Sequence, residues 1–210
     1  MSKINSVIID YSMGNLYGLK CALDHVGFKN KITNNENQIR DAQILFLPGV
    51  GSFNQAIQNL KKLSIYDYII KHNDKKKIII GICLGMQILF DEGDEGEKTR
   101  GLNLLKGKVN KLFSKKQDKL NVGWKKIMMK KNKVFNGINE TEKFYFIHSY
   151  GVVPSNKKII TSLSEFNGKK FCSSVEKNNI FGFQFHPEKS SKQGILLLKN
   201  LKKRIYEQHI

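Results

Sequence analysis

The sequence is short of cysteine and has no long apolar run, and each shortage argues against a class of protein. Its 210 residues hold three cysteines, Cys21, Cys83 and Cys172, without a Cys-x-x-Cys pair or a Cys/His cluster. A disulfide scaffold or a zinc site is therefore not expected. No apolar stretch approaches the roughly 20 residues that cross a bilayer, so we expect neither a membrane-spanning helix nor a membrane partner.

Acidic residues are scarce as well. The chain has 18 Asp and Glu against 36 Lys and Arg, which gives a formal net charge of +18. Lysines in short groups are typical of a solvated basic surface, but they would also attract an anionic ligand, an acidic partner or nucleic acid. No zinc finger, RNP-type aromatic signature or recognition helix accompanies the charge, so a nucleic-acid partner is not expected.

The rest of the composition is that of a folded protein. Forty per cent of the residues are hydrophobic and 10% are aromatic, which argues against intrinsic disorder. Pro and Gly never gather into a linker, so we predict one domain over residues 1–210. The first apolar run is short and ends at Asp10, unlike a signal peptide, and we expect a cytoplasmic protein.

Short apolar runs alternate with helical patterns in the first half. Strands are predicted at Ser6–Asp10, Ile44–Leu47 and Ile78–Ile80. Apolar residues recur at helical spacing from Leu16 to Val26, before a stop at Gly27, and from Phe53 to Leu60, after an N-cap at Ser52. A further helix should follow the third strand. This alternation predicts an α/β fold with a mostly parallel sheet flanked by helices.

Closely spaced strands follow in the second half. They are predicted at Lys108–Phe113, Val122–Met129, Phe144–His148, Phe171–Val175 and Ile180–Phe185, before a final helix from Gly194 to Tyr206. Cys21 falls in the first predicted helix and Cys172 in a strand, so both are expected to be small core residues. The α/β domain should therefore have a strand-rich second half.

The most informative segment is Ile80-Gly-Ile-Cys-Leu-Gly-Met-Gln87. It has the form Gly-x-Cys-x-Gly between a buried strand and a helix, which is the cysteine version of the nucleophile elbow. The glycines permit a tight turn that should leave Cys83 exposed at the end of the strand. The start of the helix would stabilise the thiolate and supply N–H groups for an oxyanion. A buried cysteine between helix-packing glycines is the alternative.

A base and a second glycine loop complete the pattern. In Phe185-His-Pro-Glu188, an extended chain would put His186 and Glu188 on one side, so the carboxylate could orient the imidazole toward Cys83. The alternative is a strand-end histidine beside an unrelated surface glutamate. Pro48-Gly-Val-Gly51 also follows a predicted strand, where its N–H groups could approach a substrate carbonyl.

Together these segments resemble the class I, triad-type glutamine amidotransferases, and most of all the glutaminase subunits of imidazole glycerol phosphate synthases. The similarity covers nearly the whole chain. It includes Asp10-Tyr-Ser-Met-Gly-Asn-Leu16, Pro48-Gly-Val-Gly-Ser-Phe53, Gly81-Ile-Cys-Leu-Gly-Met-Gln87, Asn121-Val-Gly-Trp124, Phe144-Tyr-Phe-Ile-His-Ser-Tyr150 and Gly182-Phe-Gln-Phe-His-Pro-Glu-Lys-Ser190.

The resemblance implies hydrolysis of glutamine through a thioester. Cys83 would attack the side-chain amide, His186 would transfer the protons and Glu188 would fix the imidazole. Backbone N–H groups of the Gly49–Gly51 loop, including Val50, and of Leu84 would hold the oxyanion. The positions that line the glutamine pocket in the family correspond to Gln87, Glu95, Ser149 and Tyr150. For Gln87 and Glu95 the alternative is an exposed helix residue and an exposed loop residue.

The resemblance also implies a partner. In the family a (βα)₈-barrel synthase receives the ammonia and makes imidazole glycerol phosphate and an aminoimidazole carboxamide ribonucleotide for histidine and purine synthesis. Asn15, Trp124 and Lys189 match positions that face this partner, although Trp124 could instead be a core aromatic. Activity would stay low until the synthase site is filled, because the Gly49–Gly51 loop must reorient. No metal or organic cofactor is implied.

Two departures from the family pattern lie near the expected interface, and they leave other functions open. Ser12 stands where glycine is common, and Asn121-Val122 replaces the usual His-Met. One alternative is a paralogous subunit that supplies ammonia to an enzyme modifying a surface-polysaccharide sugar, for instance to an acetamidino group. Others are a non-catalytic basic binding module and a stand-alone cysteine hydrolase.

Overall fold

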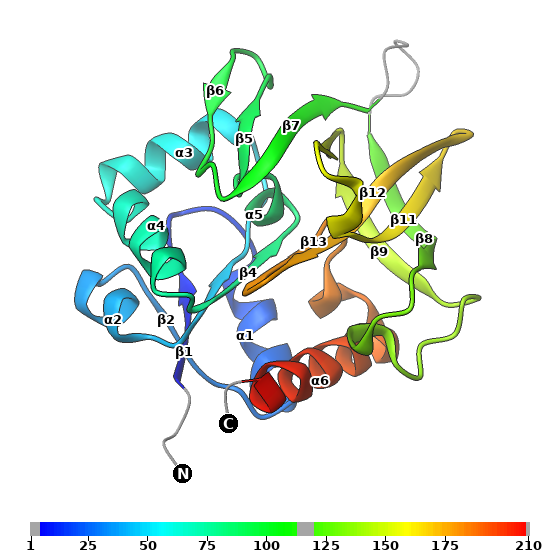
Figure 1. Cartoon of the computed structure of the whole chain (residues 1–210), viewed down its shortest axis with the longest axis horizontal. Coiled ribbons are helices and arrows are strands. Elements are labelled where there is room, and N and C mark those ends of the chain that lie inside the picture. Colours follow the sequence, from blue (N-terminus) through cyan, green and yellow to red (C-terminus); the bar gives the residue numbers. More distant parts are fainter. Residues whose placement is uncertain (1–4, 113–119, 209–210) are drawn as a thin grey trace.

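The computed structural model describes residues 5–112 and 120–208. In this part of the chain, a nine-stranded sheet runs through the molecule in the order β2-β1-β3-β4-β13-β12-β11-β8-β9 (Figure 1). Its first five strands pair in parallel and the rest pair antiparallel. A four-stranded sheet, β10-β7-β5-β6, lies beside it.

The parallel half is built by the first part of the chain. Its elements are β1 (Asn5–Ile9), α1 (Leu16–His25), β2 (Lys29–Thr33), α2 (Glu36–Asp41), β3 (Ile44–Leu47), α3 (Phe53–Lys62), α4 (Tyr66–Asp74), β4 (Ile78–Ile82) and α5 (Leu84–Gln87). The carboxyl ends of β1, β3 and β4 therefore point to one edge, which is where open α/β sheets bind ligands.

The rest of the chain supplies the small sheet, the antiparallel half and the last helix. The strands are β5 (Phe90–Gly93), β6 (Thr99–Arg100), β7 (Leu105–Lys111), β8 (Asn121–Met129), β9 (Lys143–His148), β10 (Tyr150–Pro154), β11 (Ile160–Phe166), β12 (Lys169–Lys177) and β13 (Ile180–Phe183). Short 3₁₀ helices, η1 (Lys133–Phe135), η2 (Lys157–Ile159) and η3 (Pro187–Lys189), precede α6 (Ser191–Gln208). Strand β13 returns beside β4, so residues about 100 positions apart meet at the ligand edge.

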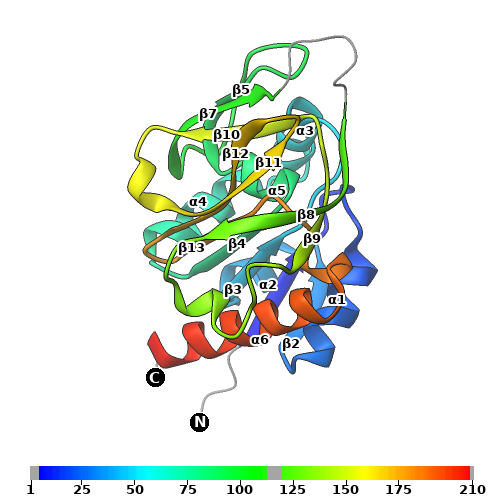
Figure 2. The same ribbon diagram turned by 90° about the vertical axis from the view of Figure 1, so that its right-hand side faces the viewer.

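Two apolar cores cover the two faces of the main sheet. Alternate residues of each strand enter different cores, as for Leu45 and Phe46 in β3. One core packs α2, α3, α4 and the small sheet against the strands, and the other packs α1 and α6. Figure 2 shows these layers, with the small sheet at the top and α6 at the bottom. No helix in the described ranges is long and apolar enough to span a membrane.

The predicted fold class is confirmed, and local signals account for several element ends. Ser52 caps α3, because its hydroxyl accepts a hydrogen bond from the Gln55 N–H at 3.3 Å. Gly27, with φ of 79°, ends the turn after α1. The predicted strand Lys108–Phe113 corresponds to β7, and its last residue lies outside the described residues.

Of the expectations for the two other cysteines and for the helix after β4, one was wrong. Cys21 is exposed, because α1 turns Leu19, Ala22 and Leu23 toward the core instead. Cys172 is buried as predicted. The helix after β4 is a single turn.

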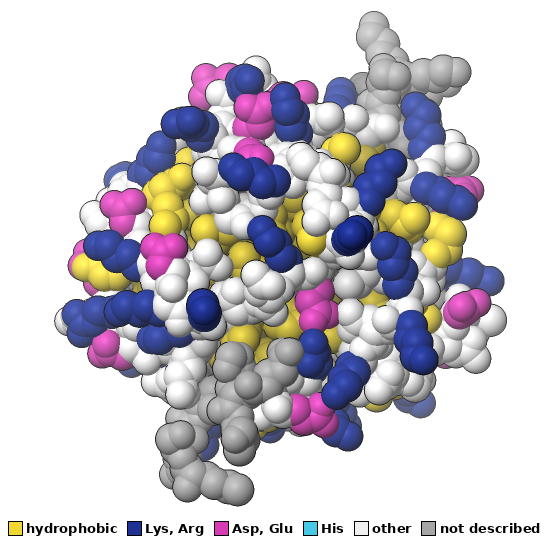
Figure 3. Space-filling view, in the orientation of Figure 1, with side chains coloured by type: hydrophobic (Ala, Val, Ile, Leu, Met, Phe, Trp, Pro, Cys, Tyr) yellow, Lys and Arg dark blue, Asp and Glu magenta, His cyan; other side chains and the backbone are white. Residues whose placement is uncertain are grey.

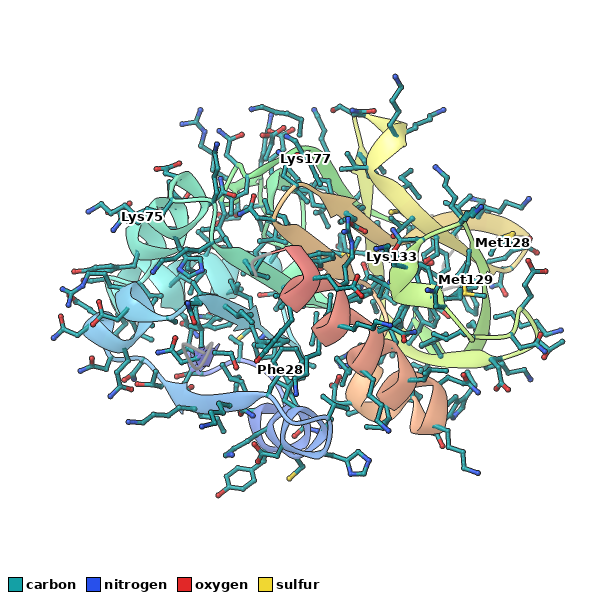
Figure 4. The ribbon with its side chains drawn as sticks, turned by 60° about the horizontal axis from the view of Figure 1, so that its bottom comes forward. Phe28, Lys75, Met128, Met129, Lys133 and Lys177 are labelled. Atoms are coloured by element: carbon teal, nitrogen blue, oxygen red, sulfur yellow. The ribbon has the colours of Figure 1, made fainter. Side chains whose placement is uncertain are left out.

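Basic side chains are spread over the face of the molecule in Figure 3 rather than gathered at one site. In Figure 3 they are scattered over the visible face, with acidic side chains among them. Lys75, Lys133 and Lys177, labelled in Figure 4, lie at the C-cap of α4, in η1 and at the end of β12. This distribution is that of a solvated basic surface.

Candidate active site

Cys83 lies at the sharp turn between β4 and α5. Its φ is 55° and its ψ is −112°, a conformation that side-chain-bearing residues rarely adopt and that costs about 1–3 kcal/mol. A Cβ on Gly85 would lie 1.7 Å from the Leu47 carbonyl oxygen, and one on Gly81 would lie 2.6 Å from the Gly85 oxygen. The glycines are therefore needed for close approach of the backbone to the elbow.

The thiol differs from expectation in its exposure. Cys83 is 4% exposed, not open to solvent, because strand β9 and the segment after β13 cover it. Its Sγ lies 3.8 Å from the Ile147 carbonyl oxygen and 3.7 Å from Gln184 Nε2. A nucleophile enclosed in this way reacts only with a substrate that fits a confined site.

His186 and Glu188 form a buried pair just beyond β13. His186 Nδ1 lies 2.8 Å from Glu188 Oε1, and the two side chains are 2% and 3% exposed. Glu188 reaches the ring from the short 3₁₀ turn η3, not from the extended segment that the sequence suggested. The Nδ1–H bond to the carboxylate leaves Nε2 as the nitrogen for proton transfer.

The charge of His186 is set by its neighbours. Burial on its own would lower the pKa of His186, but the adjacent Cys83 side chain and the Glu188 carboxylate raise it to about 10. Nε2 is buried and has no hydrogen-bond partner. A protonated imidazole beside a cysteine is the arrangement by which a histidine activates a cysteine nucleophile.

The glycine loop after β3 lies against the elbow with a carbonyl group facing it. The Leu84 N–H donates to the Gly49 carbonyl oxygen at 3.4 Å, so this predicted oxyanion donor is already engaged. Val50 is 40% exposed and Gly51 has φ of 113°. The structure thus brings the predicted loop and Leu84 together, with an oxygen where an oxyanion site requires N–H groups.

The four expected glutamine-pocket residues lie on the small-sheet side of the elbow. Gln87 is buried, and its Nε2 donates to the Tyr150 carbonyl oxygen at 2.9 Å. Glu95 follows β5, and its Oε2 accepts from the Phe53 N–H at 2.8 Å. Ser149 precedes β10, and its carbonyl oxygen accepts from the Leu112 N–H at 3.0 Å. Burial and the Glu95 carboxylate, followed by that of Asp94, raise the pKa of Tyr150.

Comparison with known proteins places this geometry in a family. The model for "Glutamine amidotransferase class-I" matches residues 7–203. The chain belongs to the class-I glutamine amidotransferases. Within them it is of the HisH type: it is 40% identical over 203 residues to the imidazole glycerol phosphate synthase subunit HisH of Aquifex aeolicus, covering 96% of this chain and 97% of that protein.

Two further comparisons agree. The HisH subunit of Pyrococcus furiosus is 42% identical over 197 residues, covering 93% of this chain and 97% of that protein. The solved structure of PurLQS from Thermotoga maritima superposes with a TM-score of 0.74 at 21% identity, covering 97% of this chain and 99% of that chain. The structural match shows the fold.

In this amidotransferase, two of the expected partner-facing residues belong to one exposed cluster. Trp124 on β8 is 47% exposed, which argues against a core aromatic. Its ring meets Tyr145 edge-on at 6.0 Å, and Lys189 Nζ lies 5.8 Å from the centre of the Tyr145 ring. Asn15 caps α1 by accepting from the Gly18 N–H. The Trp124–Tyr145–Lys189 group, called the aromatic cluster below, lies on the antiparallel half of the sheet.

The two departures from the amidotransferase pattern have local explanations. Ser12 has φ of 62°, in the region that favours the glycine usually found there. Asn121 is buried, and its Nδ2 lies 3.0 Å from His148 Nε2. Each residue therefore occupies a position with a strict steric or hydrogen-bonding demand.

Gln184 and His148 lie inside two of the segments that resemble the family, but no role was predicted for either residue. Both lie inside apolar strand segments and are buried, with Gln184 next to the Cys83 sulfur and His148 bonded to the Tyr150 carbonyl oxygen at 2.8 Å. A polar residue inside an apolar run was the available signal. Within the described ranges, no group of three or more His, Cys, Asp or Glu residues could hold a metal ion.

Proposed function

We propose that this amidotransferase hydrolyses glutamine to glutamate and ammonia, with Cys83 as nucleophile, His186 as acid and base, and Glu188 as the group that orients His186. The observation that carries the proposal is the buried His186–Glu188 pair at 2.8 Å, beside a cysteine held in a strained elbow. A scaffold without catalytic function has no physical need for this combination.

The reaction follows from these positions. The Cys83 thiolate attacks the side-chain carbonyl carbon of glutamine and forms a C–S bond. His186 donates its Nε2 proton to the nitrogen, the C–N bond breaks and ammonia leaves. His186 then takes a proton from water as the water attacks the thioester, and the C–S bond breaks to release glutamate. Gln87, Glu95, Ser149 and Tyr150 would hold the substrate, with the Glu95 carboxylate opposite its α-ammonium group.

We further propose that the ammonia passes to a (βα)₈-barrel cyclase that makes imidazole glycerol phosphate and the aminoimidazole ribonucleotide. The names of the HisH relatives support this partner. The aromatic cluster supports it physically, because exposed Trp, Tyr and basic side chains are typical anchors of interfaces. A free thiol nucleophile also fits a reducing compartment, and we place the protein in the cytoplasm.

The glycine loop supports a latent enzyme that the partner switches on. While the Gly49 carbonyl oxygen accepts from the Leu84 N–H, this N–H is not free to bind the oxyanion. A turn of the Gly49–Val50 peptide would replace this oxygen by the Val50 N–H and create the hole. Loss of one oxyanion donor costs about 10²–10³ in rate, so the isolated chain should be slow.

Glutamate release tests the proposal directly. The purified chain is assayed with glutamine alone, and then with the cyclase barrel and its ribonucleotide ligand, with Cys83→Ala as the blank. Strong stimulation that disappears in the variant supports the proposal. Activity that ignores the barrel would point to the sugar-modifying paralogue or to a free hydrolase. No activity in any combination would leave the basic binding module.

A further inference from the structure

A line of buried hydrogen bonds ends on the Cys83 sulfur, and the reaction described above does not use it. The Tyr150 carbonyl oxygen accepts from Gln87 Nε2 at 2.9 Å. The same Nε2 donates to Gln184 Oε1 at 3.1 Å, and Gln184 Nε2 donates to Cys83 Sγ at 3.7 Å. Gln87 is 4% exposed and Gln184 is 0% exposed, so water does not compete for these bonds.

The Tyr150 carbonyl oxygen, at the start of this line of hydrogen bonds, determines which way each side-chain amide is turned. A backbone carbonyl oxygen can only accept hydrogen bonds, so Gln87 must turn its NH₂ group toward Tyr150. The second hydrogen of that NH₂ group then points to the Gln184 oxygen. Gln184 in turn presents its own NH₂ group to Cys83. The polarity of two side-chain amides therefore follows from one main-chain oxygen.

The carbonyl group that begins the line is itself held in place. His148 Nδ1 donates to the same Tyr150 oxygen at 2.8 Å, and His148 Nε2 accepts from Asn121 Nδ2 at 3.0 Å. Burial, together with the charge of His186, lowers the pKa of His148 to about 4. The ring is therefore neutral at physiological pH and donates from Nδ1 only.

We propose that Gln184 stabilises the Cys83 thiolate as a direct hydrogen-bond donor, and that Gln87 is a positioning residue that keeps the Gln184 amide turned toward the sulfur. The inference rests on the proposed function in one respect, that Cys83 is the nucleophile. A thiolate that receives a fixed N–H bond is more stable relative to the thiol. Both amide hydrogens of Gln87 are committed, which leaves its oxygen for contact with glutamine.

The pH dependence of Cys83 alkylation by iodoacetamide tests this without glutamine or a partner. Gln184→Met removes the donor at similar volume. We call the pH at which the alkylation rate is half its maximum the midpoint. In Gln184→Met the midpoint should rise by about one pH unit, so alkylation below the midpoint should be about tenfold slower. Gln87→Met does not touch the sulfur, yet it should raise the midpoint in the same direction, because the Gln184 amide loses its anchor.

The double variant Gln87→Met/Gln184→Met shows whether Gln87 acts through Gln184 or acts on Cys83 independently. If Gln87 acts through Gln184, the double variant has the midpoint of Gln184→Met alone, whereas independent effects would add. Gln38→Met is the matched control, because Gln38 is partly buried on α2 beside the start of β1, away from the ligand edge, and should keep the wild-type midpoint. Circular dichroism and thermal melting establish that each variant is folded.

The outcomes are distinct. An unchanged midpoint in folded Gln184→Met overturns the inference, and so does an additive shift in the double variant. If Gln184→Met does not fold, the test rests on Gln87→Met. A wild-type midpoint in Gln87→Met overturns the positioning role of Gln87. A wild-type Cys83 that resists alkylation at every pH, in a chain that also releases no glutamate with the cyclase present, would instead remove the nucleophile, and with it the proposed function.

Discussion

Cys83 and Glu188 set the charge of His186, and they do so through contacts at a buried site. The carboxylate and the imidazole are almost completely buried, so their bond is little weakened by water or salt. The pKa of His186 rises against the effect of burial because of the adjacent Cys83 side chain and the Glu188 carboxylate. Replacing one partner should therefore alter the pH profile as well as the rate.

Glu188→Gln tests this dependence. The amide keeps the size of the side chain but removes the charge that supports the imidazolium. We expect glutamate release in the presence of the cyclase to fall about a thousandfold. The alkaline limb of the pH profile should move to lower pH, since the pKa of His186 then falls. Glu165→Gln, an exposed change on β11, should leave both unchanged. A Glu188→Gln variant with wild-type activity would contradict the orienting role.

Gly85→Ala tests the close approach at the elbow. The added Cβ would come 1.7 Å from the Leu47 carbonyl oxygen, which cannot move without shifting β3. We expect a loss of about 3 kcal/mol or more in the free energy of unfolding, measured by urea denaturation. Gly96→Ala is the comparison, because its φ is 86° but nothing lies within 4 Å, so only the conformational cost of about 1 kcal/mol remains. Equal losses would refute the steric explanation.

At the scale of elements, the sequence predicted what apolar patterns reveal. Of the strands that were predicted, β3 and β4 consist of apolar residues buried on both faces. Strand β2 was missed because it is a polar edge strand. Strand β11 was missed because Ser162 and Ser164 fill its buried positions, with Ser162 bonded to the hydroxyls of Ser173 and Ser174 at 2.6 Å.

The site was predictable in the same partial sense. The ends of parallel strands converge, so the meeting of the elbow with the glycine loop could be predicted. The side of the Gly49–Val50 peptide that faces Leu84 could not, because a glycine-rich loop permits both orientations at little cost. The short turn that carries Glu188 also lacked a periodic signal.

The start of helix α3 offers a prediction at this scale, because it is capped twice. Ser52 accepts from the Gln55 N–H and Glu95 accepts from the Phe53 N–H. Ser52→Ala should lower the free energy of unfolding by about 1 kcal/mol, measured in urea, with little change in KM for glutamine. Glu95→Gln keeps an oxygen for the cap but loses the charge, so KM should rise about tenfold or more at nearly unchanged stability. If Glu95→Gln instead behaved like Ser52→Ala, with a similar loss of stability and little change in KM, Glu95 would have only a structural role.

At the scale of the whole molecule, the buried histidines make stability depend on pH in opposite directions. Burial and the nearby Lys77 lower the pKa of His72 to about 4, and burial also lowers that of His148 to about 4. As the pH drops, both histidines become protonated in the unfolded chain before they do so in the folded protein. The free energy of unfolding therefore falls between about pH 6.5 and pH 4. His186, with its raised pKa, contributes stability that is lost as pH rises toward about 10. Stability should therefore peak near neutral pH.

Urea denaturation at pH 7 and at pH 4.5 measures the acid side of this curve. Each of the two neutral histidines should account for about 2 kcal/mol of the loss between these two pH values. His72→Gln should remove roughly half of the difference, because its amide can still donate to the Ile78 carbonyl oxygen but does not titrate. His25→Gln, an exposed change at the end of α1, should remove none. If the wild type and both variants lost the same free energy of unfolding between pH 7 and pH 4.5, His72 would be excluded as a source of acid sensitivity.

The pairing of β4 with β13 has a consequence for how the enzyme comes into being. Cys83 ends the former strand, and His186 follows the latter about 100 residues further along the chain. During synthesis the cysteine therefore leaves the ribosome long before its base exists. Until β13 docks beside β4, Cys83 lacks the imidazole of His186, so the reactive arrangement requires nearly the whole chain. Truncated translation products should consequently neither hydrolyse glutamine nor release ammonia inside the cell.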